Sequence, residues 1–362
     1  MGRGSQVDRS PGFLRGGRGG RPALFSRAHR RGRDGVSAVA GDGKEWGGQL
    51  TKIFFATDVH GSEVCWRKFI NAAKFYEANI LILGGDMTGK AIIPIIAQGK
   101  DRYKVTLLEQ ETMLEGKEAV DSMVKTIKNR GYYPYVTNPD EVASISNTPG
   151  ASDQLFLKET VRTMQEWMDS ADAKLEGSGV SCYVCPGNDD MFEIDAVIAQ
   201  SKHVRSVEGQ RTELDEHHEM ISSGWTDPTP WNTPREESEE ALRKRIDALI
   251  AQLHDIPESV FNLHAPPYGS GLDEAPELTK DMRPAYGGRS LVPVGSTAVM
   301  EVIDKYRPLL GLFGHIHEGK GTRKYGRTLC INAGSMYEQG MLCGAVIELK
   351  PKGIGTYLLV TG

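Results

Sequence analysis

Two histidines stand two residues apart near the end of the chain, in Gly314-His315-Ile316-His317. Side chains alternate along an extended backbone, so His315 and His317 would point to the same side. Neutral imidazole is the commonest protein ligand of catalytic transition metals. A single pair is weak support for a metal site, because the chain holds nine histidines and two surface histidines would give the same pattern. The prediction therefore depends on similar residues elsewhere.

Four further polar groups each follow a short apolar run of the kind that forms a buried strand. These runs cover residues 53–57, 79–83, 180–185 and 259–263. Open α/β sheets bind ligands beyond the carboxyl ends of their strands, so we expect the polar groups to meet at one edge. With the first pair, the candidate metal ligands are Asp58, His60, Asp86, Asn188, His264, His315 and His317. Oxygen and imidazole donors without a thiolate suit two borderline divalent cations such as Mn, Fe, Zn or Ni.

Residues 84–90 nearly match the Gly-x4-Gly-Lys loop that binds nucleotide phosphates. The next residue is Ala91, where that loop needs a hydroxyl for magnesium, and Asp86 lies among the amides that should cradle phosphate. We reject this interpretation.

The elements that must position these residues can be read from the spacing of apolar positions. Residues 63–78 show helical spacing between two strand-like runs, and a strand, helix and strand within about 35 residues predict a βαβ unit with parallel strands. Residues 91–178 give no further strand followed by a ligand, and we predict a helical insertion that serves packing or substrate selection. The remaining predictions are helices over 235–253 and 296–306, a strand over 308–313, and strands over 328–332, 342–349 and 355–360 that close a second sheet.

The composition, 39% hydrophobic and 25% charged, is that of a soluble globular protein. No run of about 18 apolar residues predicts a membrane span, and no secretory signal is evident, so we expect a cytoplasmic location. Five scattered cysteines do not form a disulfide framework. Cys182 and Cys185 form a C-x-x-C pair, but on a strand they would face opposite sides of the sheet, which favours two core residues.

The charge is distributed unevenly along the chain. Residues 1–47 carry a net charge of +6 with nine arginines, whereas residues 48–362 carry −11. We expect 1–47 to be a disordered Arg/Gly-rich extension, with weak RNA contact or organelle targeting as alternatives. An acidic body argues against nucleic acid as the main partner.

Taken together, the motifs resemble the calcineurin-like metallophosphoesterase superfamily. Its pattern runs Asp-x-His, Gly-Asp, Gly-Asn-His-Asp/Glu, His and Gly-His-x-His, and the resemblance extends from about residue 52 to the C-terminus. It implies an α/β fold, a four-layer sandwich of two mixed β-sheets flanked by helices, formed by residues 48–362. It also implies one metal on Asp58, His60 and His317, a second on Asn188, His264 and His315, and Asp86 bridging both.

The implied activity is that of a dinuclear-metal-dependent phosphoester hydrolase, in which a metal-bridging hydroxide attacks the phosphorus of a small phosphoester or nucleotide-like substrate. Asp86, Asn188 and Asp189 would lie at its catalytic centre. The chain departs from the family at Asp189, where histidine is usual, and at Gly89, where aspartate or asparagine is frequent. A carboxylate at Asp189 would favour a phosphodiester over the more highly charged monoester.

Two other functions remain open. Some proteins of this fold have lost hydrolysis and act as scaffolds or binding proteins, and Asp189 is the kind of change that could mark one. A DNA nuclease is a third interpretation, which the acidic body does not favour. The sequence indicates neither the oligomeric state nor the native metals.

Deleting residues 1–47 should leave melting temperature and hydrolytic rate unchanged, because the first predicted strand begins near Thr51. Thermal denaturation and a phosphodiester assay of both proteins check this. A large fall in either quantity would show that the extension belongs to the folded domain.

Overall fold

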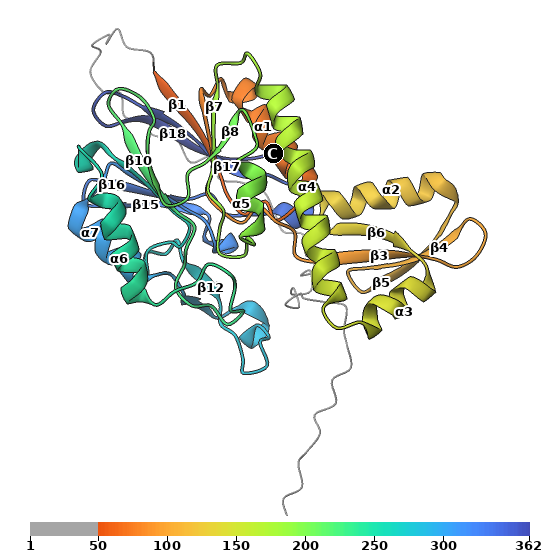
Figure 1. Cartoon of the computed structure of the whole chain (residues 1–362). Helices are drawn as coiled ribbons and strands as arrows, with labels where there is room; N and C mark the ends of the chain where they lie inside the picture. Colours follow the sequence, from red (N-terminus) through yellow and green to blue (C-terminus); the bar gives the residue numbers. More distant parts are fainter. Residues whose placement is uncertain (1–49) are drawn as a thin grey trace, which may run out of the picture.

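The computed structural model describes residues 50–362, and the predicted extension over 1–47 lies outside this range. The first of two six-stranded mixed sheets combines strands from both ends of the described chain (Figure 1). Its strands β1, β2, β7 and β8 are parallel, and β17 and β18 continue it as an antiparallel hairpin beside β1. In spatial order they are β18 (Ile354–Thr361), β17 (Cys343–Leu349), β1 (Thr51–Ala56), β2 (Ile80–Leu83), β7 (Ser181–Val184) and β8 (Val204–Ser206).

A second six-stranded mixed sheet lies against the first. Its four central strands are parallel and its two edge strands, β15 and β9, are antiparallel to their neighbours. In spatial order they are β15 (Gly321–Tyr325), β16 (Thr328–Asn332), β14 (Leu310–Phe313), β11 (Val260–Leu263), β10 (Glu219–Ser223) and β9 (Gln210–Glu213).

In the central strands of each sheet the side chains on both faces are buried, which explains the continuous apolar runs in the sequence. In β1, Phe55 packs between the two sheets, whereas Phe54 belongs to the cluster under the outer helices. Cys182 and Cys185 divide in the same way, one in each cluster, and both are buried and free. The prediction that they are core residues on opposite faces is confirmed.

Helices cover the outer faces, so the fold is a four-layer α/β sandwich of two mixed sheets flanked by helices, as the resemblance implied. The first sheet is covered by α1 (Glu63–Tyr76), α4 (Ala151–Leu175) and α5 (Glu193–Ile198). The second is covered by α6 (Glu239–Ile250) and α7 (Thr297–Tyr306). Trp66 of α1 and Trp167 of α4 stack at 4.9 Å between ring centroids and join two of these helices.

The prediction of a helical insertion over 91–178 is wrong in part, because the segment holds helices but also forms strands. The segment contains a four-stranded sheet that stands beside the sandwich (Figure 1). Strand β5 is largely exposed, β4 is partly buried, and both contain charged residues, so they lack the alternation that reveals a half-buried strand. The sheet consists of β5 (Gln110–Glu115), β4 (Arg102–Leu107), β3 (Ile92–Ala97) and β6 (Tyr133–Thr137), with α2 (Gly116–Asn129) and α3 (Pro139–Asn147).

The prediction that the strands over 328–332, 342–349 and 355–360 close a second sheet is wrong in part. Only β16 lies in the second sheet, while β17 and β18 extend the first. Alternation along a strand shows which residues are buried but does not specify the partner strand. The remaining short elements are η1 (Ile256–Glu258), β12 (Glu274–Pro276), η2 (Ala285–Gly288), β13 (Leu291–Pro293), η3 (His317–Gly319) and η4 (Tyr337–Gln339). Within residues 50–362, no helix combines the length and apolarity needed to cross a membrane.

Replacing Trp66 by alanine should lower the free energy of unfolding by about 3–5 kcal/mol, because it removes a fully buried ring stacked on Trp167. Phe75 on the same helix is 77% exposed, and its alanine variant should change stability by less than about 0.5 kcal/mol. Urea denaturation of both variants gives the comparison. Equal losses would show that the contact between α1 and α4 does not hold the outer layer.

Candidate metal centre

The candidate ligands lie where parallel strands of both sheets end. Asp58 and His60 follow β1, Asp86 follows β2, and His315 follows β14. These four residues all have positive φ, at 52°, 39°, 48° and 65° respectively. The left-handed conformation is strained for residues other than glycine and concentrates at functional sites. This backbone conformation lets each loop turn sharply at the strand end and direct a polar side chain towards the other candidate ligands.

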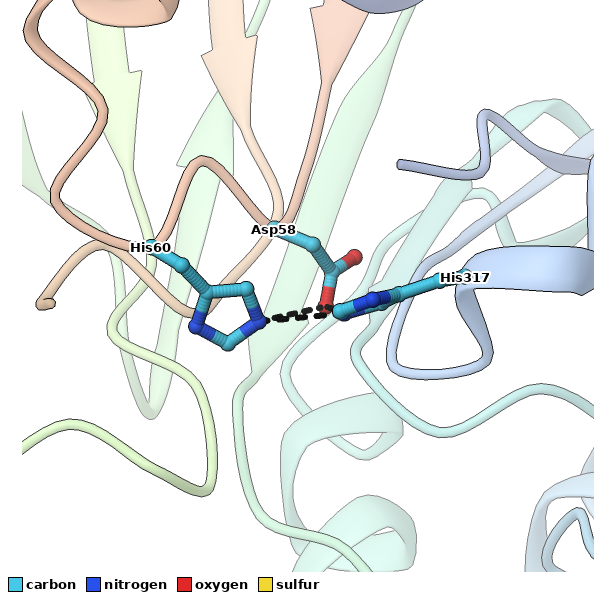
Figure 2. Close-up of side chains that lie close together, drawn as sticks. All are labelled: Asp58, His60 and His317. Atoms are coloured by element: carbon cyan, nitrogen blue, oxygen red, sulfur yellow. Dashed lines mark hydrogen bonds and ion pairs between the residues drawn. The ribbon is translucent and has the colours of Figure 1, made fainter. Parts of the chain in front are cut away.

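One group consists of Asp58, His60 and His317, whose side chains lie close together (Figure 2). The Nε2 atoms of the two histidines lie 3.0 Å apart. The Oδ1 atom of Asp58 is 3.4 Å from Nε2 of His317 and 3.8 Å from Nε2 of His60. Ligands bound about 2.1 Å from one ion are separated by about 3.0–3.4 Å in octahedral or tetrahedral geometry. Two of the three distances lie in this range, and the separation of 3.8 Å between Asp58 and His60 is longer, so a common cation would draw these two residues closer.

Asp86 lies between this group and a second one. Its Oδ2 atom is 3.5 Å from Nε2 of His60, and its Oδ1 atom is 3.4 Å from Nε2 of His264. His315 completes the second group, with one ligand atom from each of Asp86, His264 and His315 within 4.8 Å of the others. One carboxylate therefore faces imidazoles on both sides.

Asn188 and His264 each present a buried atom that has no hydrogen-bond partner among the described residues. Asn188 donates from Nδ2 to Oγ1 of Thr233 at 2.8 Å, which leaves its Oδ1 unpaired. His264 donates from Nδ1 to the carbonyl of Gly84 at 3.0 Å, which leaves Nε2 unpaired. A carbonyl only accepts, so this bond places a proton on Nδ1, and Nε2 is the atom that would bind a metal once it has lost its own proton. Both residues therefore fit a metal site.

The charges of the site depend on one another. Burial raises the pKa of the Asp58 and Asp86 carboxyls, but the neighbouring imidazoles outweigh it and hold both below the usual range. Burial lowers the pKa of His264, yet the Asp86 carboxylate raises it to about 9. Burial lowers the pKa of His315 to about 4 and that of His60 well below its usual value. At neutral pH the last two are neutral, the form that binds metals.

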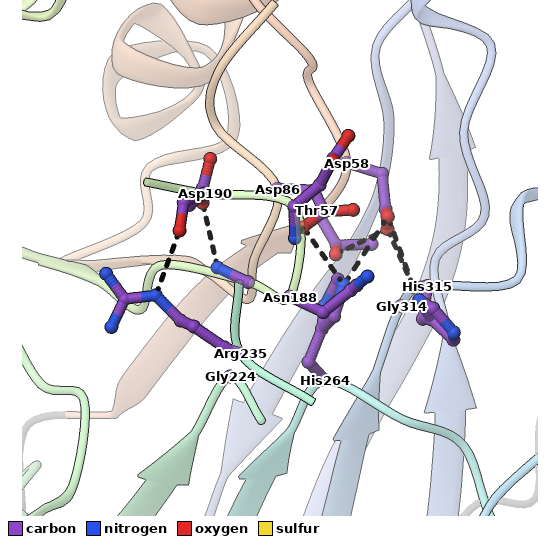
Figure 3. A network of polar contacts seen from close by, with 12 residues as sticks. Thr57, Asp58, Asp86, Asn188, Asp190, Gly224, Arg235, His264, Gly314 and His315 are labelled. Atoms are coloured by element: carbon purple, nitrogen blue, oxygen red, sulfur yellow. Dashed lines mark hydrogen bonds and ion pairs between the residues drawn. The ribbon is translucent and has the colours of Figure 1, made fainter. Parts of the chain in front are cut away.

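Asp190 links the loop after β2 to the loop after β7 by hydrogen bonds, and the sequence analysis did not name it as a site residue. It is fully buried and accepts hydrogen bonds from the backbone N–H of Gly187 at 2.8 Å and of Thr88 at 2.8 Å. Figure 3 shows Asp190 beside Arg235. The Nε atom of Arg235 donates to the carbonyl of Asp190 at 3.2 Å. The sequence signal of Asp190 was that it stands at the Asp/Glu position of the Gly-Asn-His-Asp/Glu pattern. Asp190 therefore holds the loop of Asp86 against the loop of Asn188.

Asp189 and Lys90 form an ion pair beside the candidate ligands. The backbone N–H of Asp189 donates to Oδ1 of Asp86 at 3.1 Å, and its carboxylate lies 3.0 Å from Nζ of Lys90. One oxygen of Asp189 is also within 4.8 Å of ligand atoms of His60 and Asp86. Lys90 was considered only within the rejected phosphate loop, so its contribution was missed.

The insertion contacts the centre through backbone and aromatic groups. The N–H of Gly89 donates to the hydroxyl of Tyr133 at 2.8 Å, and Ser62 donates to the carbonyl of Asn129 at 2.6 Å. Outside the insertion, Tyr337 of η4 packs against His60, with 4.8 Å between the two ring centroids. None of these contacts had a sequence signal, because each joins distant segments.

In the comparison with known proteins, no family model matches the chain. An uncharacterized protein of Methanocaldococcus jannaschii, MJ1162, is 28% identical over 149 residues, which are 41% of this chain and 61% of that protein. The match thus spans about three fifths of the relative's length.

Among solved structures, the protein TT1561 of Thermus thermophilus is 14% identical, with a TM-score of 0.47 over 87% of this chain and 99% of that one. The phosphoesterase YfcE of E. coli is 10% identical, with a TM-score of 0.31 over 85% and 98%. Likeness at this level carries no information about a reaction, and the function is inferred from the site alone.

Replacing Gly187 by alanine should weaken Mn binding at least about tenfold, because the added methyl group would overlap the carboxylate and backbone nitrogen of Asp86. The matched control is Gly355 to alanine on the edge strand β18, where the nearest atom would lie 3.3 Å away. Calorimetric titration with Mn measures both variants. Unchanged affinity in Gly187→Ala would mean that Asp86 is not a ligand.

Proposed function

We propose that this chain is a phosphoester hydrolase that works with two divalent transition-metal ions. The observation that carries the proposal is the position of Asp86, whose two carboxylate oxygens lie 3.5 Å from His60 and 3.4 Å from His264. Two neighbouring cations need such a shared carboxylate, because it offers an oxygen to each and offsets their charge. In the proposed assignment one ion is held by Asp58, His60, His317 and Asp86, and the other by Asn188, His264, His315 and Asp86.

When bound, two such ions clamp phosphate oxygens and lower the pKa of a water from 15.7 to about 7. The chain's part is to hold the ligand atoms in place. Thr57 donates to Oδ2 of Asp58 at 2.6 Å, and the N–H of His315 donates to the same oxygen at 3.1 Å. Gly84 and Thr233 orient His264 and Asn188 in the same manner. Such partners of metal ligands typically contribute about 10- to 100-fold in metal affinity or activity.

The proposed substrate is a small or nucleotide-like phosphoester, with a phosphodiester preferred over a monoester. Asp189 places a carboxylate near the candidate ligands, and it repels a monoester, which carries close to two negative charges, more than a singly charged diester. Lys90 at 3.0 Å offsets part of that charge, so the preference is expected to be modest.

The purified full chain should bind about two metal ions and hydrolyse nitrophenyl phosphodiesters faster when Mn is added. Asp86→Asn should lower kcat on the order of a hundredfold, equivalent to about 2.7 kcal/mol, since an amide is a neutral and weaker bridge. Elemental analysis, circular dichroism and the assay test both statements. Asp304→Asn, on the exposed side of α7, is the control and should behave as wild type.

Metal binding without any hydrolysis would contradict the proposal and support a scaffold that keeps its metals. Comparable turnover in Asp86→Asn with both metals still bound would remove the bridging role of this carboxylate.

A further inference from the structure

Lys90 and Asp189 carry opposite charges on the same two loops that carry candidate metal ligands. Lys90 follows Asp86 after β2, and Asp189 follows Asn188 after β7. Their charged atoms are 3.0 Å apart, and the side chains are 37% and 30% exposed. The pair is therefore beside the metal centre and open to solvent, where a substrate phosphate would approach.

We infer that Lys90 binds the phosphate oxygens of the substrate from outside the metal centre, and that Asp189 is a positioning residue that holds Lys90 there. The inference rests on the proposed function and deepens it, because it states which residues set the charge that the substrate can carry.

The backbone at both ends of the pair is held by neighbouring contacts. The Gly89 N–H is bound by Tyr133, and a methyl group on Gly89 would lie 2.6 Å from the carbonyl of Gly131. The N–H of Asp189 is bound to Asp86 at 3.1 Å. The lysine side chain itself has four flexible carbons, so the contact with Asp189 is what keeps its ammonium group beside the centre.

The chemistry of the two groups suits this division of roles. An ammonium group has three N–H donors, and a contact with Asp189 leaves others for phosphate oxygens. A carboxylate has no donor and repels phosphate, so Asp189 acts on the substrate only through Lys90 and through its own charge. The intact pair has no net charge, and removal of either member exposes the other. Asp189→Asn keeps a side-chain oxygen that can accept a hydrogen bond from Lys90, so it removes the negative charge without releasing the ammonium group. The two single variants should therefore change substrate preference in opposite directions.

The test compares Lys90→Met, Asp189→Asn and the double variant with wild type, all as full chains supplied with Mn. For a nitrophenyl monoester and the matching diester, Lys90→Met should lower the monoester-to-diester ratio of kcat/KM about tenfold. Asp189→Asn should raise that ratio severalfold, and the double variant should return to within about threefold of wild type. Lys104→Met is the matched control, because Lys104 pairs with Glu111 at 2.7 Å in the insertion sheet and should leave the ratio unchanged.

A binding measurement separates this inference from the hydrolytic function. Inorganic phosphate, titrated by calorimetry into each Mn-supplied protein, should bind about tenfold more weakly to Lys90→Met, while the metal content stays at the wild-type value. Unchanged phosphate affinity, or single variants that shift the ratio in the same direction, would overturn the inference. Loss of metal in Asp189→Asn would also overturn it, by making Asp189 a ligand together with His60 and Asp86. If wild type binds metal and phosphate but hydrolyses neither ester, the proposed function fails while the titration still decides the role of Lys90.

Discussion

The burial of two carboxylates, Asp58 and Asp86, is the constraint on which the rest of the site depends. An isolated buried charge is strongly destabilising unless it is paired and hydrogen-bonded. Here both carboxylates lie within 4 Å of imidazole nitrogens and accept hydrogen bonds, Asp58 from Thr57 and His315, Asp86 from Asp189. The acidic groups and the imidazoles therefore require one another, and a cation between them would satisfy the atoms that remain unpaired.

The surrounding fold brings these groups together by close backbone approach. Gly85, Gly187 and Gly314 each lie where a side chain would overlap a candidate ligand, so glycine is needed for the loops to meet. Asp190 accepts hydrogen bonds from backbone N–H groups of the loops after β2 and β7 and so links them. The hydroxyl of Tyr133 in the insertion binds the loop after β2. The insertion thus supports the centre as well as forming a separate sheet, and its last helix, α4, packs against the outer face of the first sheet.

Much of the sandwich could be predicted because its strands are short, buried on both faces and followed directly by polar residues. The continuous apolar run of β2 and the polar residues that follow it are local features that one stretch of sequence displays. The insertion sheet could not be predicted in this way, since β4 is only partly buried, β5 is mostly exposed, and their pairing is visible only when β3 lies beside them. The sheet to which the hairpin β17–β18 belongs was predicted wrongly for a related reason, because its partner strand β1 lies at the other end of the domain sequence.

The sequence by itself determined the chemical types of the candidate ligands and their positions at strand ends, because each type and each strand is a local property. It also determined that Cys182 and Cys185 face opposite sides, which follows from strand geometry alone. Only the tertiary structure decided that Asp86 lies between His60 and His264, that Asp190 ties the loops, and that Lys90 meets Asp189. Each of these contacts joins residues distant in sequence, and their distances depend on how two sheets and an insertion pack rather than on any local pattern.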